Sequence, residues 1–552
     1  MIRRRPRTTR NNGSRASVAL VATVAIGLAA CSSGESAITA GNDPDPADET
    51  DEPAEEDGQD DGATDGEASD DGTTAGTQDG AADDGATSDD ASDGADEEAD
   101  EGADQPADGA ADEALVALAP CPTDALADAG QPVEIEFWHG LNVDNEDAIT
   151  AVTDAYNASQ DAVVVTLQNQ GGYLDTIDKY YQSSEGSRPE LVMFPEYGLR
   201  RAIDSDTVIP AGACIESSGF DTSAFQPVVL QAYATEGVQW GMPFNVSNPV
   251  LYYDRSAFEE AGLDPDAPPR SLDELREMSQ VIVDSGAAAY GIALESGSDS
   301  GGGWFLEQFL ANLGVPYANN DNGRSAPATE VLFDGPEGVA LLTEMQSLVD
   351  DGLAVYVGDN ATGTDQFFKL ADPVEPAAMA IGTSAGLATV LNALGGGLFP
   401  DITRDDVGVG PLPGPSGEPS AIVGGAALYV VQGQGDAEAA AAWDFVEYLT
   451  TPEVQAEWAV ATGYIPLRDD ALDIEPLAST FADDARFRVA YDQLTNSTDI
   501  AAAGPLLGPH REIRNETANA VAAILGGADV ATTLTSAADT ANAFLADYNA
   551  RN

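Results

Sequence analysis

The sequence predicts an α/β protein of two lobes, joined by a hinge with a cleft between them, behind a disordered acidic tether. Strands and helices alternate from Val133 onward, which is the pattern of parallel sheets covered by helices. The stretch from Met242 to Pro269 combines proline-flanked polar residues with a short apolar run, as expected where a chain crosses between lobes. Before these elements, residues 41–113 hold 30 Asp or Glu and no Lys or Arg. One-signed charge with few apolar residues cannot offset the entropy lost on ordering, so this part is predicted to be a tether.

The N-terminus has the pattern of a secretion signal. Arginines precede an apolar run from Ala16 to Ala30, and Cys31 comes next. The run is too short for a membrane span, and Leu28-Ala29-Ala30-Cys31 resembles the lipobox of bacterial lipoproteins. We therefore expect a signal peptide over 1–30, a lipid on Cys31, and an acidic linker over 31–118 at the extracellular face of the cell membrane. An ordinary cleaved signal that loses Cys31 is the alternative, and a calcium-binding tract is the alternative for the linker.

The charge of the chain argues against a nucleic-acid partner. The formal net charge is −74, and the lysines are Lys179 and Lys369. No basic stripe is present, and such a surface is typical of a secreted protein adapted to salt. If Cys31 carries a lipid, Cys121 and Cys214 remain as an even pair in an oxidising compartment, where a disulfide is the default.

The first lobe is predicted over 132–245 and 412–450. Val133 to Phe137 alternates apolar and acidic residues like a strand with one buried face. Trp138-His139-Gly140 follows at its carboxyl end, where ligand crevices form in α/β sheets. The predicted strands are Val133–Phe137, Val163–Leu167, Glu190–Phe194 and Ala426–Val431, and the helices are Asn145–Ser159, Leu174–Ser183 and Glu438–Leu449.

The second lobe is predicted over 246–411 and 451–552. The chain should enter it through a polar turn at residues 245–248, and Ser271-Leu272-Asp273-Glu274 is a capping box that opens a helix to Asp284. Val407 to Leu412 should carry the chain back to the first lobe. The remaining predicted strands are Val250–Tyr253, Gly291–Glu295 and Ala378–Ile381, and the helices are Arg255–Ala261, Trp304–Leu313, Glu337–Asp350 and several after Pro452.

Blocks of sequence in a fixed order carry a family resemblance: Phe137-Trp138-His139, the stretch from Met242 to Pro269, Gly424-Gly425-Ala426 and Thr462-Gly463-Tyr464-Ile465-Pro466. Together they resemble bacterial extracellular solute-binding proteins of family 1, which deliver ligands to ABC importers, and the resemblance extends from Ile135 to Tyr548 with gaps. It implies the two-lobed periplasmic-binding-protein fold. It also implies a monomer that brings a small molecule to membrane permease subunits, with no cofactor and no enzymatic activity.

The resemblance further implies a ligand site. Family members that bind glycerol 3-phosphate contact it at positions that correspond here to Tyr173, Glu196, Ser247, Thr383, Gly425, Tyr464 and Arg514. Thr383 stands where the family has Ser, so the hydroxyl is kept and a methyl group is added. A phosphate needs a guanidinium and several neutral donors, which Arg514 and the hydroxyl groups would supply, while Glu196 would accept from glycerol hydroxyls.

One departure from the family pattern concerns Leu272, which stands where glycerol-3-phosphate binders have Trp. A smaller side chain there would open space for a glycerophosphodiester such as glycerophosphocholine, and Trp304 would face its quaternary ammonium group. In the alternative, Leu272 packs its helix against the core. Trp138 and Ser384 are further candidates for the cleft.

Other functions stay open at this point. An oligosaccharide-binding protein of the same family would use stacking aromatic rings and carboxylates, which Trp138, Tyr173, Trp304 and Glu196 could provide. A secreted glycoside hydrolase would need paired carboxylates, but no motif marks a pair. A structural wall protein would explain the acidic tether and not the cleft residues. His139 and His510 are too few and too separate to predict a metal site.

Overall fold

The computed structural model describes residues 120–360, 363–395, 402–497 and 503–552. The predicted signal peptide, Cys31 and nearly all of the acidic linker lie outside these residues. No helix of the described part is long and apolar enough to cross a membrane.

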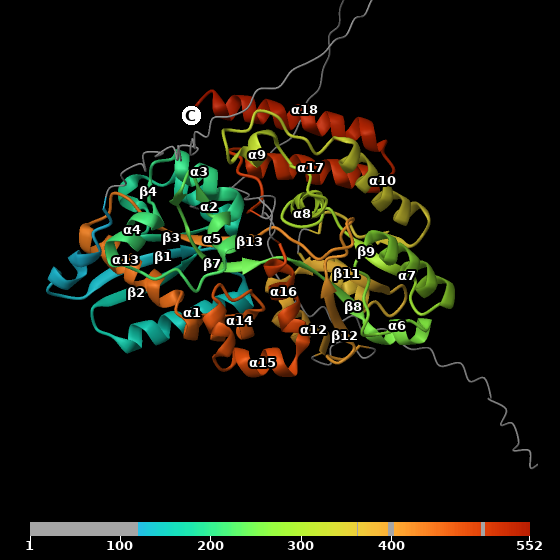
Figure 1. Cartoon of the computed structure of the whole chain (residues 1–552), viewed down its shortest axis with the longest axis horizontal. Coiled ribbons are helices and arrows are strands. Elements are labelled where there is room, and N and C mark those ends of the chain that lie inside the picture. Colours follow the sequence, from blue (N-terminus) through green and yellow to red (C-terminus); the bar gives the residue numbers. More distant parts are fainter. Residues whose placement is uncertain (1–119, 361–362, 396–401, 498–502) are drawn as a thin grey trace, which may run out of the picture. The chain divides into compact units, whose positions relative to one another are not determined.

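The first sheet has the strand order β2-β1-β3-β13-β4, and β7 pairs with β13 as an additional neighbour (Figure 1). β1 runs parallel to β2 and β3, whereas β13 runs antiparallel to β3, β4 and β7. Every second residue of β1 is buried, as the alternation predicts, and all residues of β3 are buried. The strands are β1 (Val133–His139), β2 (Val163–Asn169), β3 (Leu191–Pro195), β4 (Val208–Ile209), β7 (Met242–Ser247) and β13 (Gly424–Val431).

Helices and short turns surround this sheet and connect its strands. Helix α13 (Asp436–Leu449) contacts β1 and β13, while α1 packs on β2 and on α14 (Pro452–Thr462). A small two-stranded sheet, β5 (Ala234–Thr235) with β6 (Val238–Gln239), lies between β4 and β7 in the chain. The helical elements from Thr123 to Ala232 are η1 (Thr123–Asp128), α1 (Val143–Ser159), α2 (Tyr173–Gln182), η2 (Glu185–Ser187), η3 (Glu196–Gly198), α3 (Leu199–Asp204), α4 (Ala211–Ser218) and α5 (Pro227–Ala232).

The second sheet has the order β10-β9-β11-β8-β12. β9 runs parallel to β10 and β11, and β8 runs antiparallel to β11 and β12. Its strands are β8 (Pro249–Asp254), β9 (Tyr290–Leu294), β10 (Ala354–Tyr356), β11 (Ala377–Thr383) and β12 (Val407–Pro411), and the helical elements from Arg255 to Gly395 are α6 (Arg255–Ala261), α7 (Leu272–Ser285), α8 (Trp304–Asn312), α9 (Asn319–Gly323), α10 (Pro336–Asp350), α11 (Asp365–Leu370), η4 (Ser384–Gly386) and α12 (Leu387–Gly395).

The C-terminal helices contact both halves. α14 contacts α1, α12 and α13, whereas α17 and α18 pack against each other and against α10 (Figure 1). The elements after β13 are α13 (Asp436–Leu449), α14 (Pro452–Thr462), η5 (Asp469–Asp473), α15 (Leu477–Asp483), η6 (Ala485–Arg488), α16 (Val489–Thr495), α17 (His510–Leu525) and α18 (Val530–Asn549).

The polar turn predicted at residues 245–248 is wrong. Residues up to Ser247 belong to β7, and Ser247 pairs with Gly424 of β13. The strand escapes recognition because all its residues are buried, so Asn245 and Ser247 do not mark an exposed face. The chain passes from the first sheet to the second at Asn248, between β7 and β8, and it returns between β12 and β13. The predicted lobe boundaries stay predictions.

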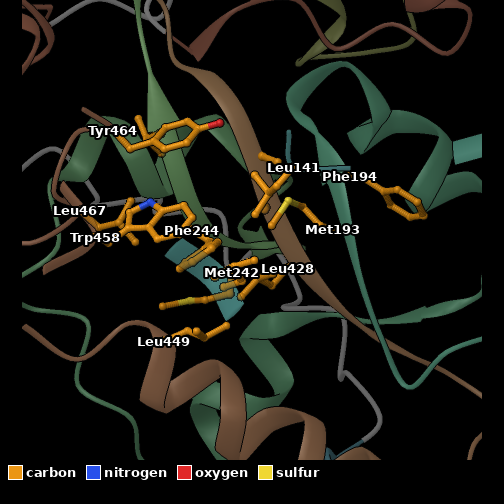
Figure 2. Packing of buried hydrophobic residues seen from close by; sticks show 14 of the residues in the cluster. Leu141, Met193, Phe194, Met242, Phe244, Leu428, Leu449, Trp458, Tyr464 and Leu467 are labelled. Atoms are coloured by element: carbon orange, nitrogen blue, oxygen red, sulfur yellow. The ribbon is translucent and has the colours of Figure 1, made fainter. Parts of the chain in front are cut away.

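A buried aromatic group supports one end of the first sheet. The indole of Trp458 stacks on the ring of Tyr464, with centroids 5.7 Å apart, and Phe244 of β7 lies 4.9 Å from Trp458. Figure 2 shows these rings together with Met242, Leu428 and Leu449. Because the buried indole of Trp458 stacks on it, the Tyr464 ring is supported from the core.

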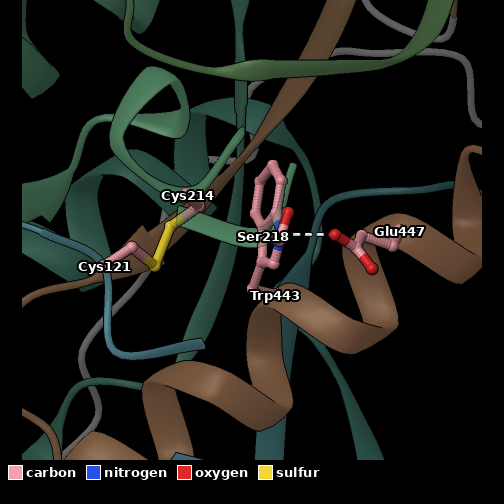
Figure 3. Close-up of a disulfide and its surroundings, with 5 residues drawn as sticks. All are labelled: Cys121, Cys214, Ser218, Trp443 and Glu447. Carbon is pink, nitrogen blue, oxygen red and sulfur yellow. Dashed lines mark hydrogen bonds between the residues drawn. A yellow bond between two sulfur atoms is a disulfide. The ribbon is translucent and has the colours of Figure 1, made fainter. Parts of the chain in front are cut away.

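Cys121 and Cys214 are joined in a disulfide, with their Cα atoms 4.7 Å apart (Figure 3). The bond ties the segment before β1 to α4. Nearby, the indole N–H of Trp443 donates to Glu447 Oε1 at 2.7 Å, which fixes this side of α13. The start of the folded part is therefore anchored to the first sheet.

Candidate functional site

A cavity of about 160 Å³ lies among residues that follow strands of both sheets. All seven positions that the family resemblance indicated lie on its wall, and so does Trp304. The wall residues taken from the predicted set are Tyr173, Glu196, Ser247, Thr383, Gly425, Tyr464 and Arg514. They are far apart in the chain, so the fold itself brings them together.

Two tyrosines and an asparagine form a hydrogen-bonded group on the first-sheet side. The side-chain amide of Asn245 donates to the Tyr173 hydroxyl at 2.6 Å, and this hydroxyl lies 3.2 Å from that of Tyr464. Asn245 is fully buried on β7 and was not predicted. An isolated amide in a buried strand was the available signal, because such a group needs a partner.

Gly425 brings a backbone segment close to the same group. Its φ is +94°, and a Cβ atom at this position would lie 1.9 Å from the carbonyl oxygen of Asn245. Only glycine fits this conformation and this approach. Gly425 follows Gly424, which pairs with Ser247, so Ser247 and the peptide groups of Gly425 reach one part of the wall.

The second-sheet side contributes Thr383 and Trp304. Thr383 ends β11, and its hydroxyl accepts a hydrogen bond from the backbone N–H of Ala385 at 3.2 Å. Trp304 begins α8 and packs against Gly424, where a Cβ atom would come within 2.2 Å of the indole. Trp304 is 5% exposed, and its indole nitrogen has no hydrogen-bond partner in the described part of the chain.

Arg514 is held by carboxylates on two elements. Its Nε donates to Glu307 Oε1 at 2.7 Å, and its Nη2 donates to Glu307 Oε2 at 2.6 Å and to Glu196 Oε1 at 2.8 Å. His510 Nε2 lies 2.8 Å from Glu307 Oε1. Glu196 follows β3 of the first sheet, whereas Glu307 lies on α8 and Arg514 on α17. The ion pairs therefore connect the two halves of the wall.

The electrostatics of this group follow from burial and pairing. Burial alone would raise the pKa of Glu307, but the charges of Arg514 and His510 lower it to about 2. Burial raises the pKa of Glu196 and of Asp299 above their usual values, despite the attraction of Arg514. Burial would lower the pKa of Arg514, but the same carboxylates raise it well above its usual value. The guanidinium is thus charged and largely balanced by the protein.

One edge of Arg514 remains for a ligand. Nε and Nη2 are bonded to carboxylates, whereas Nη1 takes part in no hydrogen bond among the described residues. The guanidinium carbon lies 4.9 Å from the centroid of the Tyr197 ring, which fixes its plane. Arg514 therefore lines the cavity with one nitrogen that is not bonded to these carboxylates, and its charge is balanced by Glu307 and Glu196.

The further cleft candidates Trp138, Leu272 and Ser384 do not line this cavity. The indole of Trp138 donates to Glu136 Oε2 on the exposed side of β1. Leu272 is 6% exposed and packs in the second hydrophobic cluster, so it opens no space in the cavity and the packing alternative describes it. Ser384 is buried, and its hydroxyl accepts from the backbone N–H of Asn248 at 3.3 Å.

Both histidines are buried within the fold. His139 is fully buried at the end of β1, and burial lowers its pKa to about 4. His510 pairs with Glu307. Among the described residues, no group of three or more His, Cys, Asp or Glu could hold a metal ion.

The sequence resembles a known protein family and individual relatives within it. The profile of the family described as "bacterial extracellular solute-binding protein" matches residues 151–488, more than half of the chain. The sn-glycerol-3-phosphate-binding periplasmic protein UgpB of Pectobacterium atrosepticum is 28% identical over 415 residues, which cover 73% of this chain and 89% of the relative. UgpB of Escherichia coli K12 is 28% identical over 360 residues, covering 63% of this chain and 77% of the relative.

Solved structures with the same fold cover three quarters of the chain. UgpB from Mycobacterium tuberculosis, in complex with glycerophosphocholine, has a TM-score of 0.61 and 22% identity, covering 75% of this chain and 98% of its own. The cyclic alpha-maltosyl-1,6-maltose binding protein from Arthrobacter globiformis has a TM-score of 0.60 and 24% identity, with 75% and 99% covered. These likenesses confirm the predicted two-lobed α/β fold.

Proposed function

The chain belongs to the bacterial extracellular solute-binding proteins, the substrate-binding components of ABC importers, and we propose that it captures a glycerol phosphate ester for a membrane permease. The observation that carries the proposal is the common wall formed by the seven predicted residues. Arg514 offers Nη1, Ser247 and Thr383 offer hydroxyl groups, and Tyr173 and Tyr464 offer phenols. Such a set of one guanidinium and neutral donors suits a phosphate ester.

The charges around Arg514 support a diester over a monoester. A phosphate monoester carries between one and two negative charges at neutral pH, since its second pKa is about 6, whereas a diester carries one. Arg514 is already paired with Glu307 and Glu196. A second negative charge on the ligand would meet these carboxylates, and among the described residues that line the cavity no Lys or Arg other than Arg514 balances it. We therefore favour a glycerophosphodiester, such as glycerophosphocholine, over glycerol 3-phosphate.

Relatives are consistent with both ligands. The curated relatives are named as glycerol-3-phosphate binders, and the structural neighbour from Mycobacterium tuberculosis was solved with glycerophosphocholine. Leu272, which the sequence suggested as the reason for a larger ligand, does not line the cavity. The preference for a diester therefore rests on charge and not on space at Leu272.

Calorimetry on the purified protein tests the proposal. Glycerophosphocholine should bind more tightly than glycerol 3-phosphate, and Arg514→Ala should abolish both signals. Binding of neither ester would refute the proposal, and tighter binding of glycerol 3-phosphate would refute the preference for the diester. Mass spectrometry of ligand carried through native purification gives an independent answer.

An oligosaccharide is the second candidate, because aromatic side chains also line the cavity. Trp304, Phe367 and Phe368 lie on its wall, and stacking rings with nearby carboxylates are typical of sugar sites. Solved neighbours include the maltose-type binder from Arthrobacter globiformis. A thermal-shift screen that contains both maltooligosaccharides and glycerophosphodiesters separates the two: a shift with sugars alone would favour this candidate.

A secreted glycoside hydrolase is the alternative of another class, and the curated relatives are binding proteins. Turnover of a bound ligand by the purified protein would establish it.

We further propose that the protein is held at the extracellular face of the cell membrane by a lipid on Cys31. Cys31→Ser should then release the protein into the medium, and unchanged membrane association would contradict the anchor.

A further inference from the structure

Asp299 is a carboxylate without a partner on the cavity wall. It lies on the loop between β9 and α8, and within the described residues it makes no hydrogen bond and no ion pair. The other carboxylates of this wall are engaged: Glu196 pairs with Arg514, and Asp144 accepts from the Thr389 hydroxyl. A half-buried carboxylate normally acquires a donor or a cation, so Asp299 is open to a group from the ligand.

The backbone of the loop that carries Asp299 is held by contacts within the loop. Glu295, which is 5% exposed, accepts from the backbone N–H groups of Gly297 and Gly301 at 2.7 and 2.8 Å. The backbone of Gly303 approaches Ser298 so closely that a Cβ atom would lie 1.9 Å from the Ser298 carbonyl oxygen. These contacts fix the backbone on both sides of Asp299.

The two arginines nearest in effect, Arg514 and Arg511, make no hydrogen bond to Asp299 within the described residues. Arg514 is close enough for its charge to be felt at Asp299, but its hydrogen bonds go to Glu307 and Glu196. Arg511 also acts on Asp299, yet its own hydrogen bonds go to both carboxylate oxygens of Asp178, at 2.8 and 2.9 Å. The negative charges near this part of the wall therefore exceed the positive ones, which favours a ligand that brings a positive group.

An aromatic ring lies on the same wall. Trp304 follows Asp299 in the same segment of the chain, and both residues line the cavity. The negative face of an aromatic ring and a carboxylate each attract an ammonium group, so the two side chains can act on the same charge.

We propose that Asp299 determines specificity for the second substituent of the ligand: together with Trp304 it accepts a cationic ammonium group, so the substrate class is zwitterionic glycerophosphodiesters. This inference rests on the proposed function. Arg514, Ser247 and the tyrosines bind the phosphate and glycerol end, and Asp299 binds the second substituent of the same molecule. Glycerophosphodiesters whose second substituent is uncharged lose this contact and keep the others.

The test compares two diesters in calorimetry with the purified protein. Glycerophosphocholine carries a cationic group, whereas glycerophosphoglycerol carries an uncharged one. Asp299→Asn should weaken binding of glycerophosphocholine about tenfold and change binding of glycerophosphoglycerol less than about twofold. Asp266→Asn is the control, because Asp266 pairs with Arg255 at 2.8 Å and does not line the cavity, and it should leave both affinities unchanged.

The outcomes separate the two proposals. Equal losses for both diesters, or no loss for glycerophosphocholine, would overturn the role of Asp299 while the proposed function stands. Failure of the unmodified protein to bind any diester would overturn the proposed function itself. Thermal unfolding of the Asp299→Asn variant, expected to match the unmodified protein, excludes a general loss of structure.

Discussion

Glu307→Gln removes one buried charge and keeps the size of the side chain. Glu307 is buried and bonded through both oxygens to Arg514, so the Gln side-chain NH2 would face a guanidinium that also only donates. The pKa of Glu307 is lowered to about 2 by Arg514 and His510 against the effect of burial. From an ordinary value near 4.5, this shift corresponds to about 3 kcal/mol of stability at neutral pH. Breaking a buried pair by removal of one partner costs about 3–5 kcal/mol, which agrees.

Urea unfolding measures this difference directly. At pH 7 the variant should lose about 3 kcal/mol of unfolding free energy. Because the folded-state pKa is depressed, the contribution is present above about 4.5 and is lost as the pH falls toward about 2, so the difference from the unmodified protein should narrow on acidification. Glu344→Gln, which breaks a half-exposed pair with Arg276, should cost less than about 1 kcal/mol.

Ligand binding gives a second measurement on the same variant. With Glu307 neutral, Arg514 keeps one carboxylate partner, so the site becomes more positive. The affinity for glycerol 3-phosphate should therefore rise relative to that for glycerophosphocholine. The reasoning is refuted if the variant is as stable as the unmodified protein at pH 7 and the ratio of the two affinities stays the same.

Further predictions concern the disulfide, a buried acid and a glycine. Replacing Cys121 and Cys214 by Ser should lower the unfolding free energy by about 4–5 kcal/mol, since the bond closes a loop with a sequence separation of 93. Burial raises the pKa of Glu295 to about 7, so its folded form retains a proton that the unfolded chain loses. Stability should accordingly fall as the pH rises from about 4.5 to about 7, and Glu295→Gln should remove this dependence in urea titrations. Gly425→Ala should abolish ligand binding in calorimetry, whereas Gly219→Ala, with positive φ but open space around it, should leave binding intact.

Local patterns predicted most of the regular elements. The alternation of β1 and the helix at Arg255–Ala261 are found as predicted, because each depends on residues that are neighbours in the sequence. β7 was missed because its polar residues are buried by pairing with β13, about 180 positions later in the chain. The two-residue strands β4, β5 and β6 were missed because two residues carry no period. β4 pairs with the distant β13, whereas β5 and β6 pair with each other across a short turn.

In the candidate site, too, some residues were predicted from the sequence, whereas residues linked only by long-range contacts were missed. The resemblance indicated seven positions, and the structure places all of them on one cavity. Glu307 and Asn245 were missed, although they hold Arg514 and Tyr173 in place. Glu307 is the single charged residue of α8, and its partner lies 207 positions away, so no spacing links the two. A lone carboxylate among Phe and Leu residues was the available signal, because a buried charge requires a partner.

The pairing of Arg514 bears on release as well as capture. A binding protein of an importer must surrender its ligand, so an uncompensated buried guanidinium facing a phosphate would be a disadvantage. Arg514 is paired with Glu307 and Glu196, so under the proposed function it would contribute a hydrogen bond to the ligand and little net attraction. Discrimination among phosphate esters then depends on how many charges the ligand carries and on their placement. Under the proposed function, this arrangement would let one arginine recognise an anion, in a chain with 96 acidic and 22 basic residues, without making the site a general anion trap.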